Sequence, residues 1–243
     1  MKTAQPPIPR FSPKTLSFLR ALKRHNDREW FTAHRDDYER EVKSRMLALV
    51  ERLAVDIQTF APELVASPRA SLFRINRDTR FSEDKSPYKT QVGCLIPHRD
   101  LPRLVGACLY LEIGPGGTMV FGGMYMPQPP ELQAVRTHIA ANYGRFRALS
   151  EPPAFRKAAG PVEGAALKRV PRGFPPDHPA AEVLKLKQYL FGREFPAAFA
   201  TSPAYYRQTL ALLRTMTPLV RFLNEPLVAR AGARDPLHLR EAD

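Results

Sequence analysis

The chain has 243 residues, of which 44% are hydrophobic and 25% charged, a composition typical of a globular protein with a sizeable core. No apolar run approaches the roughly 18 residues of a membrane span, so this composition excludes a membrane-spanning protein and we expect no membrane partner. The formal net charge of +13 keeps nucleic acid open as a partner, but the charge is spread evenly along the chain and marks no binding segment.

Residues 1–10 are rich in proline and are expected to form a flexible arm. No apolar stretch follows their lysine, so we expect no secretory signal and a cytoplasmic protein. Cys94 and Cys108 each lie among apolar residues without CxxC spacing. In that compartment, two reduced, buried thiols are favoured over a disulfide.

Helices are expected directly after the arm. Ser12 and Pro13 are typical of a helix start, and leucines at helical spacing predict a first helix that ends near residues 25–26. Asp27 is a second N-cap candidate, and one long helix behind it is predicted to stop before Pro62. The apolar face of that long helix consists of Tyr38, Val42, Met46, Leu49, Leu53, Ile57 and Phe60.

Alternation with a period of two then predicts strands. The first is expected over residues 72–76, with Phe73 toward the core and Arg74 on the other face. The run of residues 114–117, Gly-Pro-Gly-Gly, predicts a hairpin turn. Paired glycines at 122–123 inside a strand indicate a bulge or the close approach of another backbone or a ligand. The remaining strands are predicted over residues 91–97, 104–113 and 118–126.

The C-terminal third is expected to be largely helical. Pro129 begins a helix, and residues 152–179 are predicted to be irregular. Asp177 is the expected cap of a helix over residues 179–191, and a last helix begins after Ser202.

Together these elements predict the fold class α+β. We expect a single domain over residues 11–230, in which a central antiparallel sheet at about residues 71–126 carries N-terminal and C-terminal helices packed on it. A polar tail is expected over residues 231–243.

The stretch Arg74–Thr90, with the sequence RINRDTRFSEDKSPYKT, concentrates charge between two apolar runs. Arginine offers a planar fork of donors that suits phosphate or carboxylate, and lysine adds a mobile point charge, so we interpret this loop as an anion site. The alternative is that Asp78, Glu83 and Asp84 pair with the cations and the loop is structural. The candidate ligand-binding residues are Arg74, Arg77, Asp78, Arg80, Lys85, Tyr88 and Lys89.

Three further patterns bear on chemistry. Arg172, Asp177 and His178 are candidates for a second wall of the same site, with a surface turn as the alternative. Ser86 and Lys89 have the S-x-x-K spacing of a serine nucleophile and its base, with a Ser-Pro helix start as the alternative. The six histidines are scattered and form no HExxH pair, so no metal and no cofactor are predicted.

A family resemblance follows from these motifs. Phe73-Arg74, Arg77 to Ser82 and Asp84 to Thr90 together resemble the signature of a widespread microbial family of uncharacterised proteins, domain of unknown function 2461. The resemblance covers about residues 11–225 and implies membership of the family, without catalytic residues to carry over. Supporting stretches are Arg28 to Phe31, Gly122-Gly123 followed by Pro127, and Pro171 to Pro179 leading into Leu184-Lys185.

The expected function is binding, with or without turnover, of a small phosphorylated or carboxylated ligand at the Arg74–Thr90 loop. One alternative is a nucleic-acid-binding module that uses a broad basic surface. Another is a scaffold protein whose charged loop is purely structural. The patterns leave the oligomeric state and the reaction, if there is one, open.

Overall fold

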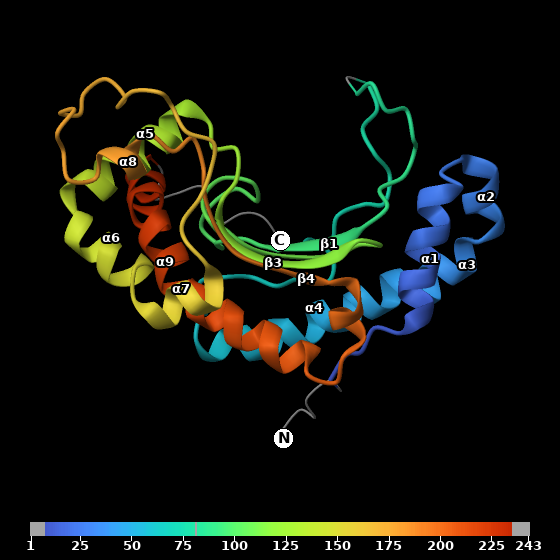
Figure 1. Cartoon of the computed structure of the whole chain (residues 1–243). Helices are drawn as coiled ribbons and strands as arrows, with labels where there is room; N and C mark the ends of the chain where they lie inside the picture. The colour runs from blue at the N-terminus through green and yellow to red at the C-terminus, as the bar shows by residue number, and fades with distance from the viewer. Residues whose placement is uncertain (1–7, 81, 235–243) are drawn as a thin grey trace. The chain divides into compact units, whose positions relative to one another are not determined.

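The computed structural model describes residues 8–80 and 82–234 and is drawn in Figure 1. Helices precede and follow one antiparallel sheet, which confirms the α+β prediction. Two compact units divide the chain: unit 1 comprises residues 1–96, 110–120 and 194–211, and unit 2 comprises residues 97–109, 121–193 and 212–243. The single domain over residues 11–230 stays a prediction. Parts of the expected arm and tail, residues 1–7 and 235–243, lie outside the described residues.

The sheet joins four strands in the order β1 (Val92–Ile96), β2 (Cys108–Ile113), β3 (Gly117–Met124) and β4 (Tyr189–Pro196). Gly114 N donates to Gly117 O over 2.8 Å, so the predicted hairpin between β2 and β3 is confirmed. In β2 the odd-numbered side chains are buried and the even-numbered ones, Tyr110 and Glu112 among them, are half-exposed. One face of this strand therefore belongs to the core and the other presents polar groups.

The helix predicted over residues 179–191 is wrong. Helix α8 (Ala181–Leu184) ends after four residues, and β4 follows it. Gly123 of β3 has a φ of 124°, and a Cβ there would lie 1.9 Å from Tyr189 O. Only glycine permits such an approach, so the expectation of a close backbone contact at residues 122–123 is confirmed.

Unit 1 begins with helices that follow one another directly. Ser12 and Asp27 are N-cap residues, as predicted, and Asp27 Oδ1 accepts a hydrogen bond of 2.8 Å from Trp30 N. The prediction of one continuous long helix is wrong, because the helix is interrupted at His34 and contains a π-helical segment. The elements are α1 (Pro13–Arg24), α2 (Arg28–Ala33), α3 (Arg35–Asp37), the π-helix η1 (Tyr38–Lys43), α4 (Ser44–Asp56) and the 3-10 helix η2 (Ile57–Thr59).

The core of unit 1 lies between α4 and the sheet. Helix α4 contacts β1 and runs along one face of it (Figure 1), and its Leu49 and Leu53 are fully buried. Cys94 of β1 is buried in this core, Cys108 of β2 is half-exposed, and both are free. The prediction of reduced cysteines is confirmed for both residues, and the prediction of burial is confirmed for Cys94 but not for Cys108. The buried face makes β1 a rigid base for the loop that precedes it.

Unit 2 is mainly helical. Helix α5 begins at Pro129, as predicted, whereas α7 lies within residues 152–179, where irregular structure was expected. Helix α9 follows the 3-10 helix η3 (Ala197–Thr201) and continues to Arg234, past the predicted start of the tail. The helices are α5 (Pro129–Ala141), α6 (Tyr143–Ser150), α7 (Pro153–Ala159), α8 and the C-terminal part of α9 (Tyr205–Arg234).

A buried asparagine of α9 holds the chain just before β2. Asn224 Oδ1 accepts a hydrogen bond of 2.7 Å from Ala107 N, and Asn224 Nδ2 donates one of 2.8 Å to Ala107 O. The side-chain amide thus satisfies both the N–H and the C=O of Ala107, as a neighbouring strand would.

Candidate functional site

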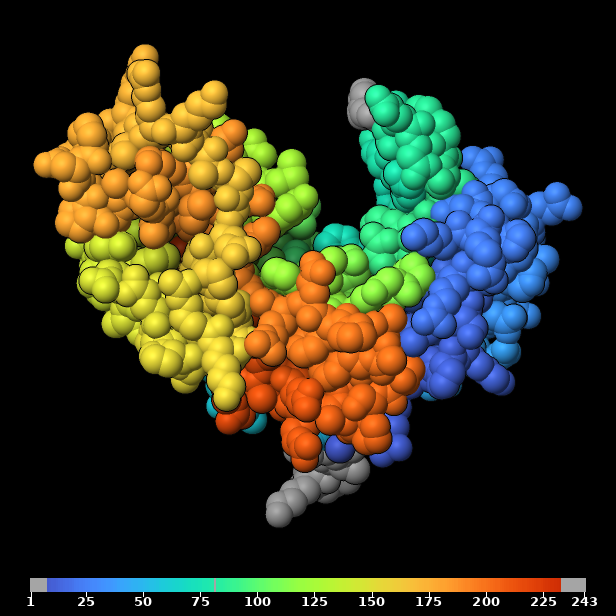
Figure 2. Space-filling view, viewed as in Figure 1, coloured from blue at the N-terminus to red at the C-terminus, as the bar shows by residue number. Residues whose placement is uncertain are grey.

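The candidate site is built on residues 74–90, which we call the site loop. The loop rises from β1 and lies beside the N-terminal helices of unit 1 (Figures 1 and 2). Its two arms are joined by backbone hydrogen bonds of 2.9 Å from Arg77 N to Pro87 O and 2.8 Å from Lys89 N to Ile75 O. The loop is therefore an irregular antiparallel hairpin and not a free coil.

The strand predicted over residues 72–76 is replaced by two isolated bridges, Leu72 with Cys94 and Asn76 with Tyr88. The alternation of exposure is present nevertheless, because Phe73 is half-buried and Arg74 is exposed. The prediction that Phe73 faces the core is not confirmed, since its ring meets that of half-exposed Tyr110 with centroids 6.1 Å apart. Irregular pairing leaves more of the loop's polar backbone and side chains available to other groups.

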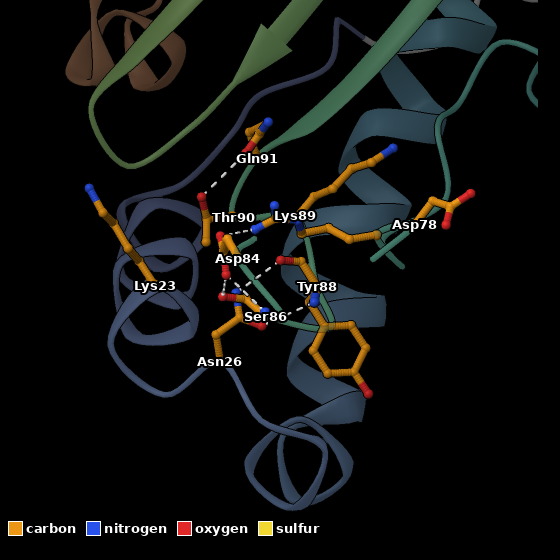
Figure 3. A pocket seen from close by; sticks show the side chains of 10 residues that line it. Lys23, Asn26, Asp78, Asp84, Ser86, Tyr88, Lys89, Thr90 and Gln91 are labelled. Atoms are coloured by element: carbon orange, nitrogen blue, oxygen red, sulfur yellow. Dashed lines mark hydrogen bonds and ion pairs between the residues drawn. The ribbon is translucent and has the colours of Figure 1, made fainter. Parts of the chain in front are cut away.

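An asparagine at the end of α1 anchors the loop to the helices. Asn26 Nδ2 donates to Tyr88 O over 2.9 Å, and Asn26 Oδ1 accepts from Tyr88 N over 3.0 Å. The ring of Tyr88 stacks on Phe31 of α2 with centroids 4.0 Å apart and is only 8% exposed. Tyr88 is thus a packing residue, and Figure 3 shows its ring directed away from Asp84 and Lys89.

A cavity of about 660 Å³ opens between α1 and the site loop (Figure 3). Lys23 lies on one side of it and Lys89 on the other, with Asp84 and Ser86 between them. All of the lining residues belong to unit 1: Lys23, Asn26, Arg77, Asp78, Asp84, Ser86, Tyr88, Lys89, Thr90 and Gln91.

The cavity gathers some of the predicted site residues and leaves others out. Arg77, Asp78, Tyr88 and Lys89 line it. Three other predicted residues do not line it. Of these, Arg80 pairs with Asp78 at 2.7 Å, and Lys85 Nζ donates a hydrogen bond of 3.0 Å to Thr79 O. The side chains outside the cavity are those of Arg74, Arg80 and Lys85.

Arg77 is held inside the loop by an ion pair and a hydrogen bond. Its guanidinium pairs with Asp84 through Nη1 and donates to Ser82 Oγ over 3.3 Å through Nη2. Asp84 also accepts hydrogen bonds from the hydroxyl and the backbone N of Ser86. These two bonds and the Arg77 guanidinium lower the pKa of Asp84 to about 2.

Asp78 is satisfied in the same way. Hydrogen bonds from the Arg80 side chain and backbone lower the pKa of Asp78 to about 2, with a smaller contribution from Arg74. Both lining carboxylates are therefore ionised and bonded to the loop itself, as the structural interpretation of the loop expects.

The S-x-x-K pattern lacks the geometry that its chemistry needs. Residues 86–89 are not helical, and Tyr88 forms a β-bridge with Asn76. Ser86 Oγ donates to Asp84, which leaves it bound to a carboxylate. The expectation of a Ser-Pro helix start at this position is therefore wrong, and so is the helical turn that would bring Lys89 beside the serine.

The predicted second wall lies in unit 2. Arg172 and Asp177 are exposed, and His178 Nδ1 accepts a hydrogen bond of 3.0 Å from Ala180 N. None of the three is a lining residue of the cavity. The histidine bond caps the turn before α8, which is the local role that the surface-turn alternative describes.

Sequence reasoning missed several lining residues. Lys23 and Asn26 are about 60 residues from the loop, so only tertiary contact brings them to it. The signal available for Thr90 and Gln91 was their position directly before the buried strand β1.

The chain was then compared with known proteins. A family model described as a conserved hypothetical protein (DUF2461) matches residues 14–222. The chain belongs to this family. Comparison with curated proteins gives no match. The DUF2461 match includes the whole site loop and every lining residue of the cavity.

Two features are absent from residues 8–80 and 82–234 of the chain. No helix there is long and apolar enough to cross a membrane. Nor do those residues bring together three or more His, Cys, Asp or Glu side chains in a group that would hold a metal ion.

Proposed function

We propose that the protein binds a small phosphorylated or carboxylated ligand in the cavity between α1 and the site loop, in the cytoplasm. The observation that carries the proposal is the placement of Lys23 and Lys89 on either side of the Asp84–Ser86 pair (Figure 3). Lys23 has no ion-pair partner among the described residues. An ammonium group at the edge of a concave, polar surface is a binding group for an anion.

The charge balance of the cavity supports this proposal. Three lining cations, Lys23, Arg77 and Lys89, face two lining carboxylates, Asp78 and Asp84. Each carboxylate is paired with an arginine of the loop: Asp78 with Arg80, and Asp84 with Arg77. Lys23, which has no ion-pair partner among the described residues, therefore attracts an incoming anion, and Arg77 and Arg80 keep the loop in shape.

This assignment changes the role of Arg77 from a ligand-binding group to a positioning group. Its fork of donors points to Asp84 and Ser82 and is about one-quarter exposed. These contacts of Arg77 hold the loop in one conformation before an anion approaches Lys89.

Thermal stability in the presence of ligand tests the proposal. A phosphorylated or carboxylated metabolite at 100 times its dissociation constant should stabilise the fold by about 2.7 kcal/mol. For a protein of this size that is a rise in Tm of roughly 5–10 °C. A screen of such metabolites with no rise for any of them would contradict the proposal.

Lys23→Gln and Lys14→Gln form a matched pair of variants. Both lysines are exposed on α1, but only Lys23 lines the cavity. We expect Lys23→Gln to weaken ligand binding about tenfold or more, because a charge-assisted hydrogen bond is lost, and Lys14→Gln to change it less than about twofold. Equal losses in both variants, with an affinity that falls steeply with salt on DNA or RNA, would support the nucleic-acid alternative instead.

A further inference from the structure

The lining of the cavity beside the site loop is polar throughout. Its described lining residues include no Ala, Val, Leu, Ile, Met or Phe. Tyr88 is the one aromatic residue among them, and its ring is only 8% exposed because it stacks on Phe31 of α2. An apolar group or a nucleobase in the cavity would therefore find no apolar or aromatic face to cover.

The cavity is also large compared with an inorganic anion. Its volume of about 660 Å³ lies within the range of roughly 300–1,000 Å³ that is typical of pockets for whole small molecules. A phosphate or carboxylate group fills only a small part of such a volume. The remainder of the ligand contacts the same polar lining, so it must itself carry hydrogen-bonding groups.

A threonine and a glutamine directly before β1 supply groups for that contact. Thr90 Oγ1 donates a hydrogen bond of 3.3 Å to Gln91 Oε1, so the oxygen of this amide is engaged. Gln91 Nε2 has no acceptor among residues 8–80 and 82–234. The amide therefore offers two N–H donors at the cavity, and the Thr90 oxygen retains acceptor capacity.

The sheet holds this pair in place. A Cβ at Gly114, in the turn between β2 and β3, would lie 3.4 Å from Gln91 Cβ, so the turn packs against the base of the glutamine side chain. Both Thr90 and Gln91 are half-buried. In Figure 3 the pair lies between the side chains of Lys23 and Lys89. A ligand whose anionic group meets Lys23 thus has its remaining groups beside the pair.

Asp84 adds an acceptor to these donors. The backbone N and the hydroxyl of Ser86 and the guanidinium of Arg77 occupy three positions on the Asp84 carboxylate. An ionised carboxylate offers about four, so one acceptor position remains. The other lining amide, Asn26, differs from Gln91 because both of its polar atoms are bound to the backbone of Tyr88.

We propose that the ligand of this cavity is a sugar that carries a phosphate or a carboxylate group. Lys23 binds the anionic group, Gln91 donates to sugar hydroxyls, and Asp84 accepts from them. A hydroxyl both donates and accepts, so it suits a lining in which donors and acceptors lie side by side, whereas a second anionic group would be repelled by Asp84. Binding forms and breaks no covalent bond. This inference rests on the proposed function and narrows its ligand class.

Two matched pairs of small molecules test the inference on the unmodified protein, by calorimetry at constant ionic strength. Glucose 6-phosphate is compared with cyclohexyl phosphate, and glucuronate with cyclohexanecarboxylate. Both members of a pair have the same anionic group on a six-membered ring, but only the sugar carries hydroxyls. We expect at least one sugar to bind about tenfold or more tightly than its analogue, because two or more hydrogen bonds are lost with the hydroxyls. The pair that shows this preference identifies the anionic group.

Gln91→Met and Gln133→Met form a matched pair of variants. Methionine keeps the length of the side chain without its N–H donors. Gln133 is exposed on α5 and does not line the cavity. We expect Gln91→Met to reduce the preference for the sugar by about threefold or more and to change the affinity for the cyclohexyl analogue less than about twofold, whereas Gln133→Met should alter neither. Lys23→Gln should weaken both members of a pair alike.

The outcomes distinguish the inference from the proposed function. If none of the four compounds and no metabolite of the screen binds, the anion site itself is refuted. If the cyclohexyl analogues bind the unmodified protein as tightly as the sugars, the anion site stands and the sugar class is refuted. An unchanged preference in Gln91→Met would likewise overturn the inference, and the comparison on the unmodified protein decides the question even if that variant fails to fold.

Discussion

The anchor of the site loop gives the sharpest test of how the loop is held. Asn26→Ala removes the two hydrogen bonds, 2.9 and 3.0 Å long, that tie Tyr88 to the end of α1. Each such bond contributes about 1 kcal/mol, so about 2 kcal/mol of the free energy that keeps the loop closed should be lost. That energy corresponds to a roughly 30-fold increase in the population of the opened loop.

Amide hydrogen exchange measures this opening directly. Tyr88 N loses its acceptor in Asn26→Ala, and Lys89 N, which donates to Ile75 O, lies next to it. We expect both amides to exchange roughly 30 times faster, while amides of the buried strand β1 keep their wild-type rates. If opening of the loop is part of global unfolding, Tm should also fall by about 4–8 °C.

Asn26→Asp is the matched control. Its carboxylate still accepts from Tyr88 N but no longer donates to Tyr88 O, so we expect about half of the effect. An unchanged exchange rate of Tyr88 in Asn26→Ala would refute the claim that this side chain anchors the loop.

Three other expectations follow from single residues. The pKa of Asp84 is about 2 in the folded protein and near 3.8 in the unfolded chain, so its ionised form stabilises the fold fully above pH 3.8 and loses this effect as the pH falls toward 2. In Asp84→Asn, the free energy of unfolding should therefore depend less on pH between about 4 and 2. Cys94, whose pKa burial raises to about 12, should resist a thiol reagent in native Cys108→Ser protein and react fully after denaturation. Gly123→Ala should cost more than about 3 kcal/mol in the free energy of unfolding, measured with denaturant, because its Cβ would meet Tyr189 O at 1.9 Å.

Features set by neighbouring residues could be predicted from the sequence. Ser12 and Asp27 cap helices through bonds that span three residues, and the hairpin at residues 114–117 is closed by one bond between its ends. Such contacts depend on local chemistry, which the sequence displays directly. The same holds for the alternation of Phe73 and Arg74 in the site loop.

Features set by distant residues could not be predicted. The residues of β4 follow a run of good helix formers in α8, and their pairing with β3 depends on Gly123, more than sixty residues earlier. The π-helical turn at Tyr38–Lys43 is likewise invisible to a search for regular spacing, because Tyr38 and Val42 fit an ordinary helix equally well.

The candidate site shows the same division. Its loop was identified because charge concentrated between Arg74 and Thr90 is visible in the sequence. Which charges remain for a ligand was decided by tertiary structure, which pairs Arg77 with Asp84 and brings Lys23 to the cavity. Composition alone ranks an arginine above a lysine as an anion-binding group, and that ranking fails for Arg77 and Arg80 because their guanidinium groups are already bound within the loop.

The two asparagine anchors suggest why the loop is suited to binding. Asn224 holds Ala107 with a fully buried amide, whereas Asn26 holds Tyr88 at a half-buried position. Water competes better for the second pair, so the site loop is fastened less firmly to α1 than the chain before β2 is fastened to α9. An anion bound between Lys23 and Lys89 would join the same two segments that Asn26 joins. Ligand binding and the Asn26 anchor therefore reinforce each other, because each reduces the entropy that the other must remove from the loop.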